Sequence, residues 1–180
     1  VLFDTARKTF RTEIFPQYKA HRPPPPEELI PQFALVRDAV RAMCVSCIEK
    51  EGFEVTYLPV NPEGLVTAQQ VKDAIRPDTI LVSVMWANNE TGVLFPLEEI
   101  AAICRSKGVL YHTDAVQVPG KLKVDVDELG VDFLSLSAHK LHAPKGVGLL
   151  YCRYTAPYHS YVIGGGQEKG RRGGTENVPY

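Results

Sequence analysis

The sequence predicts an α/β fold with a mostly parallel sheet and flanking helices. Short apolar runs typical of buried strands alternate with segments of helical periodicity. The 180 residues are 44% hydrophobic and 23% charged, with a net charge of −1, as in an ordinary soluble globular chain. The best apolar run, the eight residues from Ile80 to Ala87, is too short for a membrane-spanning helix. No membrane role is therefore predicted.

The first predicted elements precede the sheet. Apolar residues at helical spacing predict a helix over 32–51, and apolar/polar alternation predicts a strand over 53–58. Thr67 is a suitable N-cap for a helix over 68–76, because its hydroxyl can accept from the first free N–H groups and Pro77 follows.

One long helix and four strands complete the pattern. Pro96 can open a helix that carries Glu98 and Glu99 in its first turn, where the helix dipole favours acidic groups, and Gly108 can close it. Buried strands are predicted over 80–85, 109–112, 131–136 and 147–152. Strands that alternate with helices imply parallel pairing.

Composition changes along the chain. Residues 1–51 contain no glycine, whereas all fourteen glycines fall between Gly52 and Gly174. Pro23 to Pro26 form a four-residue run that favours polyproline II. Two segments of different origin would show this shift naturally, although a single domain can show it by chance.

Polar clusters follow three of the predicted strands. They are Asn88–Gly92, Thr113–Gln117 and Ser137–Lys140. Because the carboxyl ends of parallel strands meet at one edge of a sheet, these clusters could build one site. It would contain a carboxylate, a lysine, a histidine, a hydroxyl and amides.

This set of groups suits pyridoxal phosphate. A lysine can form a Schiff base with an aldehyde, a buried aspartate can keep a pyridine nitrogen protonated, and hydroxyl and imidazole groups can hold a phosphate. Plainer interpretations exist: Lys140 could be a surface lysine, and Asp114 could cap a helix beginning at Ala115. His139 and His142 could be a metal pair, but the spacing places no third ligand.

Four motifs in order carry a resemblance to a known family. They are Asn88–Gly92, His112–Gln117, Ser137–Gly148 and Gly164–Asn177. Together they resemble the successive motifs of cysteine desulfurases, which are class V pyridoxal-phosphate enzymes, and they are closest to the nitrogen-fixation branch. The resemblance covers residues 45–180 and implies part of the large, cofactor-binding domain of that fold.

The resemblance implies roles for the residues that face the cofactor ring. Lys140 would be the catalytic lysine that forms the Schiff base, and Asp114 would face the pyridine nitrogen. Gln117 would face the phenolic oxygen, with Asn89 near that oxygen and the substrate.

Other residues would bind the phosphate. Ser137 and His139 would hold it within the same subunit. Thr175, in a glycine-rich segment that could also be a flexible linker, would reach the cofactor phosphate of the neighbouring subunit in a homodimer.

The implied reaction converts L-cysteine to L-alanine and transfers the sulfur to an enzyme cysteine. An acceptor such as an iron–sulfur scaffold protein would then receive it. None of the four cysteines, at positions 44, 47, 104 and 152, matches the family's nucleophile, so we expect this chain to be inactive by itself. Few, scattered cysteines favour a reducing, cytoplasmic location.

Residues 1–44 resemble a different protein, the 5′-nuclease domain of bacterial DNA polymerase I. The resemblance rests on Phe3-Asp4, Lys8–Arg11 and Tyr18–Pro24. Asp4 would match a metal-binding carboxylate, but one carboxylate cannot build the two-metal site of such a nuclease. The alternative function is therefore a metal-dependent nuclease fragment joined near Cys44 to an inactive remnant. The net charge gives no support for nucleic-acid binding.

Overall fold

The computed structural model describes residues 49, 52–160 and 164–175. The segment 1–44, with Asp4 and the proline run, lies outside the described residues. So does the predicted helix over 32–51, apart from Glu49.

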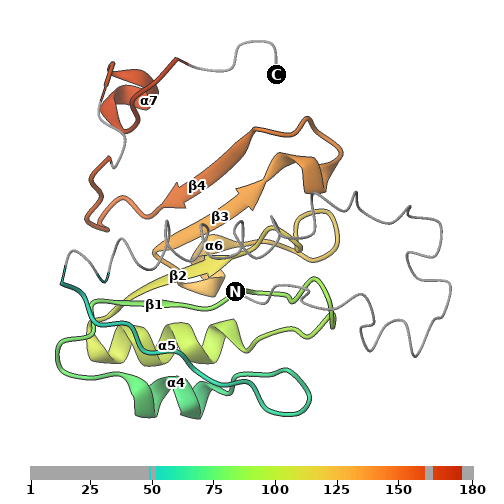
Figure 1. Ribbon diagram of the computed structural model, residues 1–180, viewed down its shortest axis with the longest axis vertical. Coiled ribbons are helices and arrows are strands. Elements are labelled where there is room, and N and C mark those ends of the chain that lie inside the picture. Colours follow the sequence, from blue (N-terminus) through green and yellow to red (C-terminus); the bar gives the residue numbers. More distant parts are fainter. Residues whose placement is uncertain (1–48, 50–51, 161–163, 176–180) are drawn as a thin grey trace, which may run out of the picture. The chain divides into compact units, whose positions relative to one another are not determined.

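A four-stranded sheet forms the centre of the described fold (Figure 1). Its strands are β1 (Leu81–Ser83), β2 (Leu110–Asp114), β3 (Phe133–Ser137) and β4 (Gly148–Cys152), paired in that order. β1, β2 and β3 are parallel, and β4 is antiparallel to β3. The prediction of a mostly parallel α/β sheet is confirmed, and each strand begins and ends within two residues of its expected range.

Helix α4 (Ala68–Ala74) begins where the sequence predicts. Thr67 forms a capping box: its Oγ1 accepts from the Gln70 N–H at 3.2 Å, and its own N–H donates to Gln70 Oε1 at 2.8 Å. The helix ends two residues earlier than expected. Pro77 explains this, because a proline disfavours helical backbone in the residue before it.

Helix α5 (Leu97–Lys107) connects β1 to β2. Gly108 ends it with φ 68°, and the Gly108 N–H donates to carbonyls of the last turn. The buried residues of α5 fall on one stripe, namely Leu97, Ile100, Ala101 and Cys104. Within the described part of the chain, no helix is long and apolar enough to cross a membrane.

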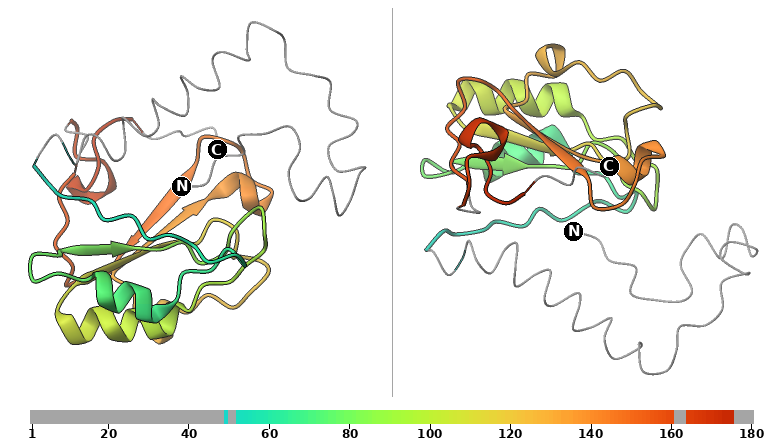
Figure 2. Two further views of the ribbon diagram at one scale, coloured as in Figure 1. Left: turned by 60° about the horizontal axis from the view of Figure 1, so that its bottom comes forward. Right: turned by 90° about the horizontal axis from the view of Figure 1, so that it is seen from above.

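The helices cover one face of the sheet. α5 packs on β2, and α4 packs on α5, so both helices lie on the same side (Figures 1 and 2). Tyr111, Thr113 and Leu134 point into this core and are fully buried. The alternate residues of the same strands, including His112 and Asp114, lie on the other face and are half-buried. We call this second face the open face.

One expectation was wrong: residues 53–58 form no strand. The antiparallel pairing of β4 is compatible with a mostly parallel sheet. It arises because only residues 138–147 connect β4 to β3, and a parallel crossover needs a dozen residues or more. Three short helices were not predicted: α6 (Val126–Leu129), η2 (Ala138–Leu141) and α7 (Gln167–Gly170).

Candidate active site at the carboxyl edge of the sheet

The segments that follow β1, β2 and β3 meet at the carboxyl edge of the sheet. Backbone hydrogen bonds extend the pairing beyond the strands: the Trp86 N–H donates to Asp114 O at 2.8 Å, and the Ala115 N–H donates to Ser135 O at 3.0 Å. The loop after β2 also comes near η2, since a Cβ on Gly120 would lie 3.9 Å from Leu141. The three polar clusters therefore share one edge.

Asp114 is the last residue of β2, in the interior of the sheet. Its side chain is on the open face, and Oδ1 accepts from the Val116 N–H at 3.0 Å, as in an Asx turn. No helix begins at Ala115 in the structure, so Asp114 is not a helix cap. Gln117 is half-buried in the turn that follows, and its backbone carbonyl accepts from Lys121 Nζ at 2.8 Å.

Ser137 is the last residue of β3 and shares a face with Asp114. The register pairs Asp114 with Ser135, and Ser137 lies two residues further along, so all three side chains point the same way. Ser137 Oγ hydrogen-bonds with His139 Nδ1 at 2.8 Å. Gly148 pairs with Ser137, and a Cβ there would lie 3.0 Å from Leu136 O, so glycine allows the close approach of β4.

His139 and Lys140 lie on η2, directly after β3. Both side chains are exposed. The short helix ends at His142, which has a left-handed φ of 63°, and its N–H donates to Ala138 O. Imidazole and amine are thus presented to solvent beside Ser137.

Asn89 lies in the loop after β1 and is exposed. Its neighbour Asn88, which is 3% exposed, shapes this loop. Asn88 Oδ1 accepts from the Glu90 N–H at 2.8 Å and the Thr91 N–H at 2.9 Å. The sequence analysis assigned no role to Asn88, although it begins the run Asn88–Gly92 and asparagine is a typical turn former.

Six of the seven predicted residues therefore lie along one edge of the sheet. The seventh, Thr175, belongs to the separately described segment 164–175, where its carbonyl accepts from Arg172 at 3.3 Å. Among the described residues, no group of three or more His, Cys, Asp and Glu side chains could hold a metal ion.

His112 is a second residue for which the sequence analysis gave no role. Its Nδ1 hydrogen-bonds with Ser83 Oγ on β1, and its Nε2 with Ser135 Oγ on β3, both at 2.8 Å. Burial lowers the pKa of His112, and the nearby Asp114 carboxylate opposes this shift. Only the alternation of His112 with Asp114 along the strand could have indicated its position.

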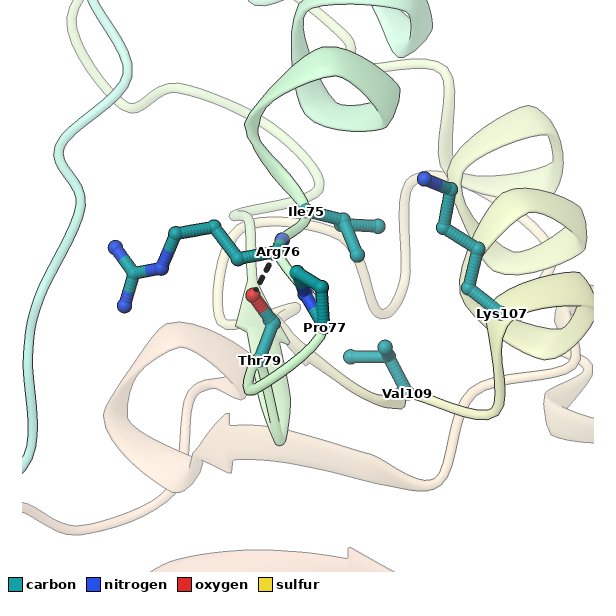
Figure 3. A pocket seen from close by; sticks show the side chains of 6 residues that line it. All are labelled: Ile75, Arg76, Pro77, Thr79, Lys107 and Val109. Atoms are coloured by element: carbon teal, nitrogen blue, oxygen red, sulfur yellow. Dashed lines mark hydrogen bonds between the residues drawn. The ribbon is translucent and has the colours of Figure 1, made fainter.

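A hollow of about 270 Å³ lies at the opposite, amino edge of β1 and β2 (Figure 3). The cationic side chains of Arg76 and Lys107 lie on opposite sides of it, with Ile75, Pro77 and Val109 between them. Arg76 is bound to Asp78 through Nε at 3.0 Å. The polar groups that line this hollow do not converge on one point, so the hollow is not a candidate active site.

The carboxyl edge has the chemistry that a phosphorylated pyridine aldehyde needs. A carboxylate ends β2, and a hydroxyl, an imidazole and an amine follow one another at the end of β3. The amine can bond to an aldehyde, the carboxylate can face a ring nitrogen, and the Ser137–His139 pair can bind an anion.

Comparisons with known proteins agree with this reading. The aminotransferase class-V family matches residues 37–178. Residues 1–55 match the 5′-3′ exonuclease N-terminal resolvase-like domain. Cysteine desulfurase IscS of Clostridium botulinum strain Hall is 52% identical over 131 residues, which are 73% of this chain and 33% of that protein. The mitochondrial cysteine desulfurase of Saccharomyces cerevisiae is 50% identical over 146 residues, 80% of this chain and 28% of that protein.

Solved structures give the same result. A structure described as SspA in complex with cysteine has a TM-score of 0.73 and 44% identity, over 79% of this chain and 41% of that one. A NifS-like protein has a TM-score of 0.70 and 44% identity, over 74% of this chain and 37% of that one. The chain spans about a third of the length of the curated relatives that it matches. The family match over residues 37–178 and the similar folds of the solved structures agree, and the chain belongs to the aminotransferase class-V family.

Proposed function

We propose that this chain is the cofactor-binding part of a pyridoxal-phosphate-dependent cysteine desulfurase. The observation that carries the proposal is the shared face of Asp114 and Ser137 on neighbouring strands, with Lys140 directly after Ser137. The names of the relatives at 50–52% identity support the same activity.

Each residue at the edge has a task in this proposal. Lys140 attaches the cofactor through its amine. Asp114 holds a proton on the ring nitrogen, and its Asx turn fixes the carboxylate at the end of β2. Ser137 and His139 bind the phosphate as a pair that is already hydrogen-bonded. When bound, pyridoxal phosphate supplies the electron sink for cleavage at the substrate's β-carbon.

Amides and a second subunit complete the site. Gln117 lies in the turn after Asp114 and is proposed to face the phenolic oxygen, while Asn89 presents its amide from the loop that Asn88 shapes. Thr175, an exposed residue of the glycine-rich segment, is proposed to bind the cofactor phosphate of a partner subunit in a homodimer.

The proposed substrate is L-cysteine, and the proposed product is L-alanine with sulfur carried to an acceptor protein such as an iron–sulfur scaffold. The similar solved structure described as SspA in complex with cysteine supports the proposal that cysteine is the substrate. The four scattered cysteines support a reducing compartment such as the cytoplasm.

The first experiment mixes the 180-residue chain with pyridoxal phosphate. We expect a visible absorbance band, and borohydride reduction followed by peptide mapping should find the pyridoxyl group on Lys140. Lys140→Ala should abolish both signals. Lys145→Ala is the matched control, because Lys145 is an exposed lysine of the same β3–β4 connection. A band that survives in Lys140→Ala would overturn the assignment.

Sulfur transfer should be undetectable with this chain alone. Burial raises the pKa of the Cys104 thiol to about 11, so little thiolate forms at neutral pH. Cys152 is the last residue of β4, and Cys44 and Cys47 lie outside the described residues. Sulfide released from L-cysteine by the 180-residue chain, and lost in Lys140→Ala, would contradict this expectation.

The exonuclease match favours a second proposal for the N-terminal segment. Residues 1–44 are proposed to derive from a 5′-nuclease domain and to be joined near Cys44 to the desulfurase part at 45–180. The two family matches overlap at residues 37–55, an interval that contains Cys44. Sequencing genomic DNA across codons 40–50 tests the join. Magnesium-dependent cleavage of a DNA flap, lost in Asp4→Asn, would show instead that the segment is an active nuclease.

A further inference from the structure

A row of three polar side chains crosses the parallel strands on the open face. His112, in β2, hydrogen-bonds with Ser83 of β1 and Ser135 of β3, each at 2.8 Å. Both ring nitrogens are therefore engaged, each by a hydroxyl of a different strand. A neutral imidazole satisfies this arrangement by donating from one nitrogen and accepting at the other. The roles proposed above use none of these three residues.

The two hydrogen bonds have different directions. Ser83 is the register partner of His112, so the bond to β1 runs straight across the sheet. On the other side the register partner is Phe133, yet the ring binds Ser135, which pairs with Asp114 two residues nearer the carboxyl edge. The bond to β3 is therefore diagonal.

A diagonal bond constrains how β3 lies along β2. Backbone pairing alone can be restored after a shift of two residues, since such a shift keeps every side chain on its own face. If β3 shifted towards the carboxyl edge, Phe133 would take the diagonal position and the His112–Ser135 bond would be lost. If β3 shifted the other way, Ser137 would take that position and would leave its place beside Asp114. Because Ser137 and η2 follow Ser135 directly, the same bond sets their distance from Asp114.

We propose that His112 is a positioning residue, which through Ser83 and Ser135 holds β1, β2 and β3 in the register that brings Asp114 beside Ser137 and Lys140. This inference rests on the proposed function, because the edge that is positioned is the proposed cofactor site. His112 acts through the two serines and touches no reacting group.

Amide hydrogen exchange on the 180-residue chain tests the positioning directly and needs no cofactor. The Ala115 N–H donates to Ser135 O and reports on β2–β3 at the carboxyl edge. The Leu110 N–H donates to Ile80 O and reports on the amino edge. Ser135→Ala should speed exchange at Ala115 about threefold to tenfold, the effect of one lost hydrogen bond, and leave Leu110 unchanged.

Three further variants separate positioning from a general loss of stability. Ser135→Thr keeps the hydroxyl and should restore slow exchange at Ala115. Ser83→Ala removes the bond to β1 and should speed exchange at Trp86, whose N–H donates to Asp114 O. Ser106→Ala is the matched control, because Ser106 Oγ donates to Ile103 O within α5. Equal acceleration at Leu110, or failure of Ser135→Thr to restore Ala115, would overturn the proposal. If Ser135→Ala does not fold, Ser83→Ala decides the question at Trp86.

Titration with pyridoxal phosphate then links the register to the site. Ser135→Ala should weaken binding about threefold to tenfold, with recovery in Ser135→Thr. If the unmodified chain forms no visible band, the proposed function fails, while hydrogen exchange still decides the role of His112. If the unmodified chain and Ser135→Ala bind equally well, the positioning role is overturned and the proposed function stands.

Discussion

The two faces of the sheet are built from alternate residues of the same strands, yet they differ in character. On the helix-covered face, Tyr111 and Leu134 are each 1% exposed. On the open face, His112, Asp114 and Ser135 are half-buried and polar. Because successive side chains of a strand point to opposite faces, one short segment supplies residues both to the core and to the proposed cofactor site. Stability and binding should therefore respond to different, interleaved substitutions.

Hydrogen bonding also differs between the faces. In the described part of the chain, the hydroxyls of Tyr111 and Thr113 are buried on the covered face without a hydrogen-bond partner, and burial raises the pKa of Tyr111. On the open face, His112, Ser83 and Ser135 bond with one another. Burying each of these two hydroxyls without a partner costs free energy, whereas the polar groups of the open face satisfy one another.

The largest expected effect is on the covered face. Leu134→Ala removes a fully buried side chain and leaves a cavity in the core, so it should lower the free energy of unfolding by about 2–5 kcal/mol. Urea denaturation followed by circular dichroism measures this. A loss below about 1 kcal/mol would mean that the helices do not pack on this face as described.

Asp114→Asn should separate binding from stability. The amide oxygen can still accept from the Val116 N–H, so the free energy of unfolding should change by less than about 0.5 kcal/mol. The lost negative charge should weaken pyridoxal phosphate binding about tenfold to a hundredfold, the value of a hydrogen bond to a charged group. Absorbance titration measures the affinity, with exposed Asp127→Asn as the control. Unchanged affinity in Asp114→Asn would remove Asp114 from the site.

His112→Gln should remove a part of the pH dependence of stability. The pKa of His112 is lowered in the folded chain, so below about pH 6.5 the unfolded chain takes up a proton that the folded chain does not. Stability should therefore fall as the pH falls through this value, and less so in His112→Gln. Urea midpoints at pH 7.5 and 5.5 give the pH-dependent change in stability for the unmodified chain and for His112→Gln. The other histidines contribute equally to both proteins, so the difference between the two changes reports on His112. An equal loss of stability in both proteins would contradict the lowered pKa of His112.

The smallest effect belongs to an apolar residue of the open face. Leu150 is 47% exposed in β4, so Leu150→Ala should cost less than about 1 kcal/mol. The same urea experiment compares it with Leu134→Ala. A cost as large as that of Leu134→Ala would mean that something packs against the open face in solution.

Local signals predicted the elements that depend on local chemistry. Thr67 and Gly108 mark helix ends because their capping bonds involve residues within one turn. The strand proposed over 53–58 failed because alternation shows only that a segment could pair, and pairing depends on a partner distant in sequence. The direction of β4 could have been inferred from the ten-residue connection 138–147.

The sequence predicted that the residues of the proposed site share one edge of the sheet, but it did not predict the hydrogen bonds among their neighbours. Polar clusters after buried strands placed Asp114, Ser137 and Lys140 at one edge, because parallel strands share a direction. The bonds of His112 depend on the register of three strands, and no local pattern specifies which serine lies opposite or diagonal. Asn88 is similar, since its burial follows from the fold of its loop.

β4 is the last strand of the described sheet, and its exposed residues are apolar: Leu149 is 57% exposed and Leu150 is 47% exposed. An edge strand offers unpaired N–H and C=O groups, and here it also has an apolar surface. Such an edge can pair with a strand of another chain, which leads to aggregation. We therefore expect the purified chain to self-associate as its concentration rises. Leu149→Lys should reduce aggregation in concentrated samples, because a charge on an edge strand opposes pairing with another chain.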